Sequence, residues 1–177
     1  IIVIDSAGYG PVAIPQSVSI IAAPGVYAGI SVFAGNGVTI TGVGSRVRLS
    51  GLTINGQGGD IGIHFQQGSK LSIDHCTIVD LNLYGLYVQA ANSTWIVTDT
   101  TINGNASYAI LAEAGAGTLD RVRVENNFNV GILVNTSSNF QDAQGWYVND
   151  PNRFGLLSTD RPSIFKLFGS YDIFGIQ

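Results

Sequence analysis

An all-β solenoid with three short strands in each coil is the fold that this sequence predicts, on three observations. A near-repeat of 22 to 24 residues runs through residues 47–134. Within each repeat apolar residues alternate with polar ones, as they do in half-buried strands. Glycine and asparagine gather between these stretches, where turns often need positive φ angles. No stretch has the spacing of an amphipathic helix of useful length.

Two apolar columns define the repeat. The first follows a glycine or alanine and contains Ile30, Ile63, Leu86, Ile110, Ile132, Leu156 and Ile176. The second precedes that glycine or alanine by seven or eight residues and contains Ile54, Ile78, Ile102, Val124, Val148 and Phe168. A single coil cannot bury its inner face alone, so a shared register predicts coils stacked on one another. We therefore expect a right-handed parallel β-helix of about six to seven coils.

The chain is expected to form one domain, residues 1–177, in three parts. Residues 1–46 are irregular first coils, residues 47–134 are regular coils, and residues 135–177 are divergent terminal coils with an aromatic tail. In the first part, residues 38–41 are expected to add a strand that later coils lack. This extra strand would explain the long first step of the repeat, 33 residues from Gly29 to Gly62. A further inner column is expected to contain Val32, Phe65, Val88, Ala112 and Val134.

Composition excludes several classes of protein. Charged residues make up 11% and hydrophobic residues 45%, which argues against disorder. The net charge of -4 argues against a nucleic-acid groove, which needs clustered basic residues. No apolar run reaches the ~18 to 20 residues of a membrane helix. The N-terminus lacks a basic region, so no signal peptide is expected and the chain is interpreted as a mature or excised segment. The single cysteine, Cys76, is expected in the core.

Three stretches carry a resemblance to a known family: Asp5–Val12, Ser17–Val26 and Leu52–Gly56. They resemble bacterial right-handed β-helix repeat proteins with the pectin-lyase-like fold, over roughly residues 1–135. The resemblance implies a secreted or cell-surface bacterial protein. It also implies that a cap over the first coil is missing before Ile1. It brings no agreed activity.

Carbohydrate-active β-helices hold their site on the outer face of one strand column, and the resemblance would place it near Ile54, Ile78 and Ile102. His75, Asp99 and Arg121 are expected to point outward there, ~5 Å apart on successive coils. A histidine beside a carboxylate and a guanidinium is a candidate acid/base group. However, oppositely charged neighbours on a solenoid surface also stabilise strand pairing modestly.

The other signatures of catalysis are missing. The paired aspartates, His-Gly and Arg-x-Lys expected of galacturonases of this fold are absent. Four acidic residues are expected to be too dispersed for a calcium site, namely Asp74, Asp80, Asp99 and Asp120. We therefore expect no metal and no cofactor, and we retain a polysaccharide lyase or glycoside hydrolase only as the alternative.

An outer column gives the main functional hypothesis. The residues that follow the first apolar column are Ser31, His64, Tyr87, Leu111, Leu133 and Leu157. The last four form an apolar stripe, which predicts a surface for self-association, as a trimer first and a dimer second. The alternative is that the aromatic tail covers the stripe; that tail contains Phe165, Phe168 and Phe174. The predicted function is a non-catalytic structural or binding solenoid, with carbohydrate retained as a second class of ligand.

Overall fold

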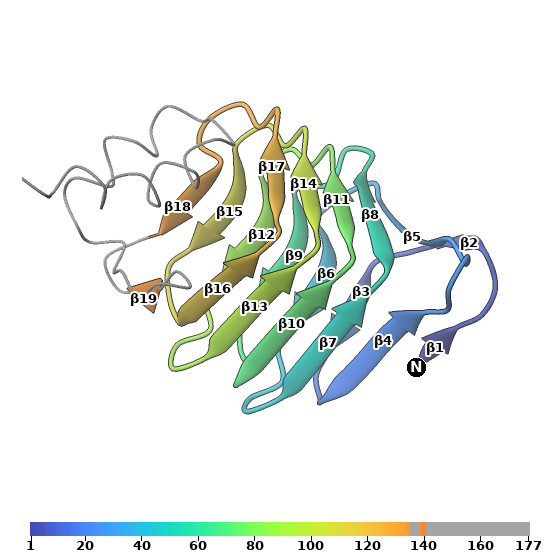
Figure 1. Ribbon diagram of the computed structural model, residues 1–177, viewed down its shortest axis with the longest axis horizontal. Helices are drawn as coiled ribbons and strands as arrows, with labels where there is room; N and C mark the ends of the chain where they lie inside the picture. Colours follow the sequence, from blue (N-terminus) through green and yellow to red (C-terminus); the bar gives the residue numbers. More distant parts are fainter. Residues whose placement is uncertain (135–138, 141–177) are drawn as a thin grey trace, which may run out of the picture.

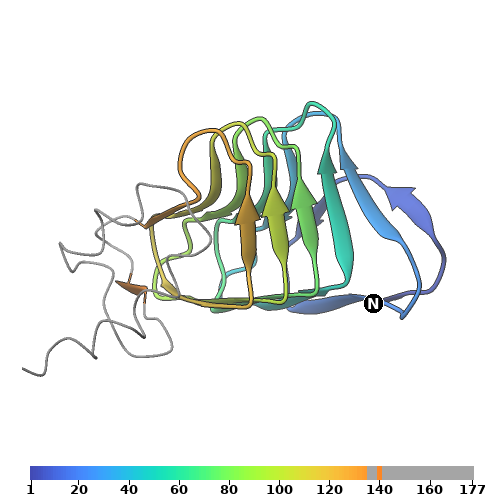
Figure 2. The same cartoon turned by 45° about the horizontal axis from the view of Figure 1, so that its top comes forward.

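The computed structural model describes residues 1–134 and 139–140, and it shows a right-handed parallel β-solenoid with three strands per coil (Figure 1). The predicted fold is therefore confirmed. Strands β1–β18 come in six successive triplets, and β19 begins another. Figure 2 shows the strands of successive coils side by side across the long axis. Within the described part of the chain, no helix is long and apolar enough to cross a membrane.

Each strand of a triplet belongs to a different parallel sheet. Sheet A contains β1 (Ile2–Val3), β4 (Val18–Ala22), β7 (Arg46–Ser50), β10 (Lys70–Asp74), β13 (Thr94–Thr98), β16 (Ala116–Asp120) and β19 (Asn139–Phe140). Sheet B contains β2 (Ala7–Tyr9), β5 (Ala28–Val32), β8 (Leu52–Gly56), β11 (Thr77–Val79), β14 (Thr101–Asn103) and β17 (Arg123–Glu125). Sheet C contains β3 (Val12–Ile14), β6 (Asn36–Ile40), β9 (Ile61–Phe65), β12 (Tyr84–Val88), β15 (Tyr108–Ala112) and β18 (Ile132–Val134).

The three sheets enclose one core built from the predicted columns. Ile54, Ile78 and Ile102 pair in register in sheet B and are fully buried. Sheet C contributes a second such column with Ile63, Leu86 and Ile110. Burying a side chain of this size contributes about 1.5–3 kcal/mol, so a register that keeps every column inside is strongly preferred.

One part of the predicted register was wrong. Ile30 pairs with Ile54 in sheet B, and Val32 pairs with Gly56, so both residues were assigned to the wrong column. Val38 pairs instead with Ile63. The strand at residues 38–41 is therefore not an addition: β6 is the ordinary sheet C strand of its coil. Residues 1–46 consequently follow the same three-sheet plan as the later coils.

The close approach of the backbones of successive coils shows which glycine precedes the first apolar column in the early coils. A Cβ on Gly37 would lie 2.8 Å from the carbonyl oxygen of Gly62, and one on Gly62 would lie 2.6 Å from that of Gly85. At Gly29 a Cβ would meet the side chain of Tyr27 instead, which is the end of a flexible group. Gly37 is thus the structural equivalent of Gly62, and the first step of the repeat is ordinary in length.

Candidate functional site

The three predicted polar residues lie together, but in a bend and not on a strand face. His75, Asp99 and Arg121 follow sheet A strands at the turn into sheet B, which we call the A–B corner. Their φ angles are 49°, 46° and 51°, and Gly51 takes φ 72° at the same place one coil earlier. The left-handed conformation costs a non-glycine residue about 1–2 kcal/mol. Because Gly51 shares it, the geometry belongs to the fold, and only the side chains are specific to this corner.

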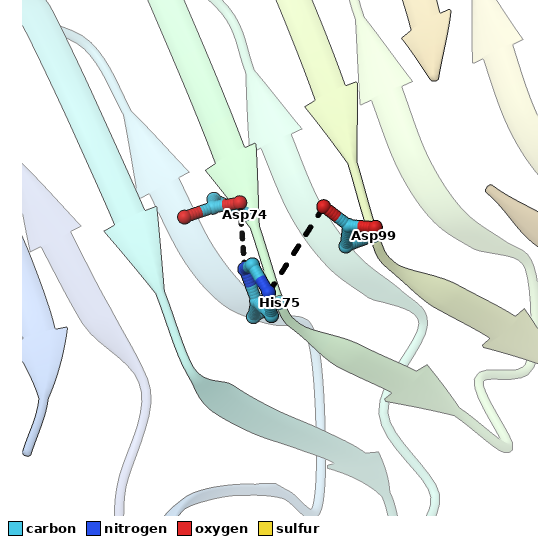
Figure 3. Close-up of side chains that lie close together, drawn as sticks. All are labelled: Asp74, His75 and Asp99. Atoms are coloured by element: carbon cyan, nitrogen blue, oxygen red, sulfur yellow. Dashed lines mark hydrogen bonds and ion pairs between the residues drawn. The ribbon is translucent and has the colours of Figure 1, made fainter. Parts of the chain in front are cut away.

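The imidazole of His75 lies between two carboxylates (Figure 3). Its Nδ1 is 2.8 Å from Oδ1 of Asp74, which is a hydrogen bond. Its Nε2 is 4.0 Å from Oδ2 of Asp99, which comes from the next coil. Sequence reasoning missed Asp74 as a member of this group. The available signal was the Asp74-His75 pair one repeat before Asp99.

Arginines neutralise both carboxylates of the A–B corner. Arg121 donates from Nε and Nη2 to Asp99, at 2.6 and 2.8 Å, and its Nη1 is 2.7 Å from Oδ2 of Asp120. Arg48 donates to Oδ2 of Asp74 at 3.2 Å. Each carboxylate therefore has a guanidinium partner. The side chains of His75 and Arg121 are exposed, at 67% and 63%, whereas those of Asp74 and Asp99 are partly buried, at 21% and 27% exposure.

These contacts hold the carboxylates in the ionised form. Burial raises the pKa of Asp74, but hydrogen bonds from His75 and Arg48 outweigh it, and the net pKa is lowered. The hydrogen bond from Arg121 lowers the pKa of Asp99. A general acid of a glycosidase needs the opposite change, a raised pKa. Asp74 and Asp99 are therefore suited to hold a cation or to orient the imidazole, and not to donate a proton at neutral pH.

Two of the four acidic residues that were expected to be too dispersed for a calcium site, Asp74 and Asp99, lie beside the same imidazole. One ligand atom each from Asp74, His75 and Asp99 lies within 4.8 Å of the others. Asp120 lies at the same corner through its contact with Arg121. Asp80 follows β11, at the turn from sheet B to sheet C. The turn and strand positions looked separate in sequence because the residue after β7, β10, β13 and β16 takes a left-handed conformation, which breaks the alternation of side chains between the two faces.

The second candidate is the outer face of sheet C. His64, Tyr87, Leu111 and Leu133 pair in register on successive strands. The residue that precedes them in the column is Thr39, because Ser31 pairs with Asn55 in sheet B. Four further residues predicted for this surface lie outside the described residues: Leu157, Phe165, Phe168 and Phe174.

Aromatic rings stack along this face. His64 and Tyr87 stack with centroids 4.8 Å apart, and Tyr84 and Tyr108 stack at 5.6 Å. Tyr84 also lies 5.2 Å from Tyr87, so the two stacks join. Sequence reasoning missed Tyr84 and Tyr108, although both precede the glycine or alanine of the repeat by one residue. His64 is 8% exposed and Leu111 is 7% exposed, so the middle of the stripe is already well packed.

A chain of hydrogen bonds ties the polar groups of this face to one another. Asn36 contacts Nδ1 of His64 at 3.2 Å, and Nε2 of His64 contacts the Gln89 side-chain oxygen at 2.8 Å. The Gln89 amide donates to the Tyr87 hydroxyl at 2.6 Å, which donates to Glu113 at 2.7 Å. Burial, and then the bond to Glu113, raise the pKa of Tyr87 to about 12. The phenol is therefore a neutral structural donor across the physiological range.

Cys76 has no place in either candidate site. It is 2% exposed within the apolar core, as expected. Burial raises the pKa of its thiol to about 11, which leaves almost no thiolate at neutral pH. Cys76 is therefore a small core residue.

Comparison with known proteins places the chain by its fold. No curated protein and no solved structure matched it. A family model described as "Right handed beta helix region" matches residues 3–144, which is most of the chain and includes both candidate sites. The repeating columns, the three parallel sheets and this match agree, and the chain belongs to the right-handed β-helix family.

Proposed function

We propose that this protein is a non-catalytic solenoid that self-associates through the outer face of sheet C. The observation that carries the proposal is the joined stack of His64, Tyr84, Tyr87 and Tyr108, beside Leu111 and Leu133. Tyrosine and other large side chains are enriched at protein interfaces, where charged residues are depleted. We call these six residues the sheet C face.

The hydrogen bonding of this face favours a protein partner over a sugar. Its amide, phenol and carboxylate groups already bond to one another, from Asn36 through to Glu113. Such a surface can be covered without leaving unpaired polar groups, which would each cost about 1–3 kcal/mol. A sugar would need free donors and acceptors and an open ring face. Here the stacks cover one face of the His64, Tyr84, Tyr87 and Tyr108 rings.

The size of the face sets the expected strength of association. Four strands ~4.8 Å apart, three of them with five residues and β18 with three, cover roughly 300 Å² at ~3.3 Å per residue. A standard interface buries about 800 Å² on each partner. We therefore expect weak assembly, as a trimer first and a dimer second, with a dissociation constant on the order of 10–100 μM.

Sedimentation over a concentration series tests the proposal. Leu133→Asp changes a partly buried residue at the end of the column and should reduce the average mass while leaving the circular dichroism spectrum unchanged. The matched control is Ile96→Asp, an outward and partly buried aliphatic residue on sheet A, which should leave the mass unchanged. A strictly monomeric wild type at about 1 mM would overturn the proposal, because that is well above the expected dissociation constant.

A polysaccharide lyase or glycoside hydrolase is the second candidate. The observation that favours it is the imidazole of His75 between two carboxylates. Turnover of any member of a panel of acidic and neutral polysaccharides, lost in His75→Ala, would establish this second function. Absence of turnover across the panel would leave the scaffold as the better account.

A further inference from the structure

We infer that the A–B corner binds a divalent transition-metal ion, with Nε2 of His75 and a carboxylate oxygen of Asp99 as its protein ligands. Asp74 is the positioning residue that orients the imidazole. This site lies at a bend of the solenoid and uses none of the residues of the sheet C face. It is therefore independent of the proposed self-association.

The orientation of the imidazole supplies the first argument. Nδ1 of His75 donates to Asp74 at 2.8 Å, which directs the lone pair of Nε2 toward the next coil. Metal-binding histidines commonly have this arrangement, in which a carboxylate accepts from the other ring nitrogen and fixes the tautomer. Asp99 lies on the side to which Nε2 points (Figure 3).

The spacing supplies the second argument. Nε2 of His75 and Oδ2 of Asp99 are 4.0 Å apart, which is too long for a hydrogen bond. It is somewhat longer than the ~3.4 Å that separates two ligand atoms of a tetrahedral metal ion with bonds of ~2.0–2.2 Å. A small rotation of the Asp99 carboxylate toward His75 would therefore let one ion bind both atoms. The ligand atoms of the three-residue group lie up to 4.8 Å apart, which is too wide for three ligands of one ion and leaves Asp74 in its orienting role.

The donor set selects the class of ion. One imidazole nitrogen and one carboxylate suit Zn²⁺, Ni²⁺ or Cu²⁺. Ca²⁺ requires six to eight oxygen ligands, more than this corner offers. Two protein ligands leave the remaining coordination positions to water. With 67% of the His75 side chain exposed, solvent has direct access.

Arg121 opposes the metal and provides a distinctive test. Its two hydrogen bonds occupy both oxygens of Asp99, and its positive charge lies next to the proposed ion. Metal binding must displace or reorient this guanidinium, which limits the affinity. Removing Arg121 should therefore tighten binding, an effect that a nonspecific surface site would not show.

Calorimetric titration of the full chain with Zn²⁺ alone at neutral pH is the experiment. We expect one site with a dissociation constant on the order of 10–100 μM. His75→Ala and Asp99→Asn should each weaken binding by about tenfold or more, because each removes a ligand. Arg121→Ala should tighten it about threefold or more by removing a competing charge within hydrogen-bond distance of Asp99.

The chain offers a matched control, since it has two histidines. Both ring nitrogens of His64 are engaged, by Asn36 and Gln89, and the residue is 8% exposed. His64→Gln, with its fold checked by circular dichroism, should bind Zn²⁺ like the wild type. The inference would be overturned if the wild type gave no heat of Zn²⁺ binding, or if His75→Ala bound Zn²⁺ with the same dissociation constant as the wild type. Loss of binding in a folded His64→Gln variant would overturn it as well.

Discussion

The A–B corner and the sheet C face are built by the same repeat, yet they differ in how firmly their side chains are held. At the corner, His75 and Arg121 are about two-thirds exposed. On the sheet C face, His64 and Leu111 are each less than one-tenth exposed. Exposed ion pairs contribute about 0–1 kcal/mol, because water screens them. The charged side chains of the corner can therefore exchange one ion-pair partner for another at little cost in free energy. The side chains of the sheet C face are instead packed against their neighbours.

The difference follows from where each column lies in the coil. Strand residues such as Tyr87 and Leu111 have a paired strand on either side, ~4.8 Å away. Their side chains therefore pack against those of both neighbouring strands. The corner residues lie at a bend with left-handed backbone geometry, where side chains project from the convex edge. One repeat thus places packed side chains on the strands of sheet C and exposed ion pairs at the A–B corner.

The largest expected effect comes from placing a charge in the sheet C face. Leu111→Asp buries a carboxylate at a position that is 7% exposed and removes an apolar side chain. We expect the free energy of unfolding to fall by about 3 kcal/mol or more, measured by urea denaturation. Ile96→Asp on sheet A, which is only partly buried, should cost clearly less. Equal losses in the two variants would show that the sheet C face is no better packed than an ordinary outer face.

The second-largest effect is expected at alkaline pH, which should distinguish the sheet C face from the A–B corner. The pKa of Tyr87 is raised to about 12 in the folded protein, against about 10 in an unfolded chain. Its contribution to stability is therefore fully present below about pH 10 and is lost as the pH rises toward 12. Thermal melts across this range should show a steeper loss for the wild type than for Tyr87→Phe. At neutral pH the same substitution should cost about 1 kcal/mol, through the lost hydrogen bonds.

Control variants decide whether the alkaline effect belongs to Tyr87. Tyr27 is exposed, directly precedes the sheet B strand β5 and takes no part in this network, so Tyr27→Phe should leave the pH dependence unchanged. A wild-type profile identical to that of Tyr87→Phe between about pH 10 and 12 would contradict the buried, hydrogen-bonded state of this phenol.

The core of the fold could be predicted from the sequence because two apolar columns must keep the same register. Ile54, Ile78 and Ile102 share one spacing with Ile63, Leu86 and Ile110, and a slip would expose both sets. The register of the early coils was wrong because Gly29-Ile30 and Gly37-Val38 offer the same pattern within one coil. Only the close approach of Gly37 to the backbone of Gly62 distinguishes them, and that contact joins separate coils.

The candidate sites were predictable only in part, for a related reason. The period brought His75, Asp99 and Arg121 together, but it could not include Asp74. A left-handed residue after the strand breaks the alternation that assigns side chains to faces. On sheet C the period identified Tyr87 and Leu111. The bonds among long side chains such as Gln89 and Glu113 depend on their rotamers, which no repeat pattern specifies.

Acid should reveal the smaller contribution of the A–B corner. The folded-state pKa values of Asp74 and Asp99 are lowered, so their contribution is present above the unfolded value of about 3.9 and is lost as the pH falls below it. Asp74→Asn and Asp99→Asn should each flatten the loss of stability between about pH 5 and 2. Chemical denaturation at several pH values measures this. Unchanged profiles in both variants would show that the ion pairs of the corner add nothing to stability.

The smallest expected effect concerns the backbone of the corner itself. His75 holds φ 49°, a conformation that glycine adopts without strain. His75→Gly should therefore raise the free energy of unfolding by a few tenths to about 1 kcal/mol, after part of the relieved strain is offset by the greater entropy of an unfolded glycine. Ser72→Gly, at an outward position in the middle of β10, should instead lower stability by about 0.5–1 kcal/mol. If His75→Gly lost as much stability as Ser72→Gly, the contacts of the imidazole with Asp74 would have to outweigh the backbone strain. The side-chain contacts of the A–B corner would then stabilise the fold, and the corner would differ less from the sheet C face in how firmly its side chains are held.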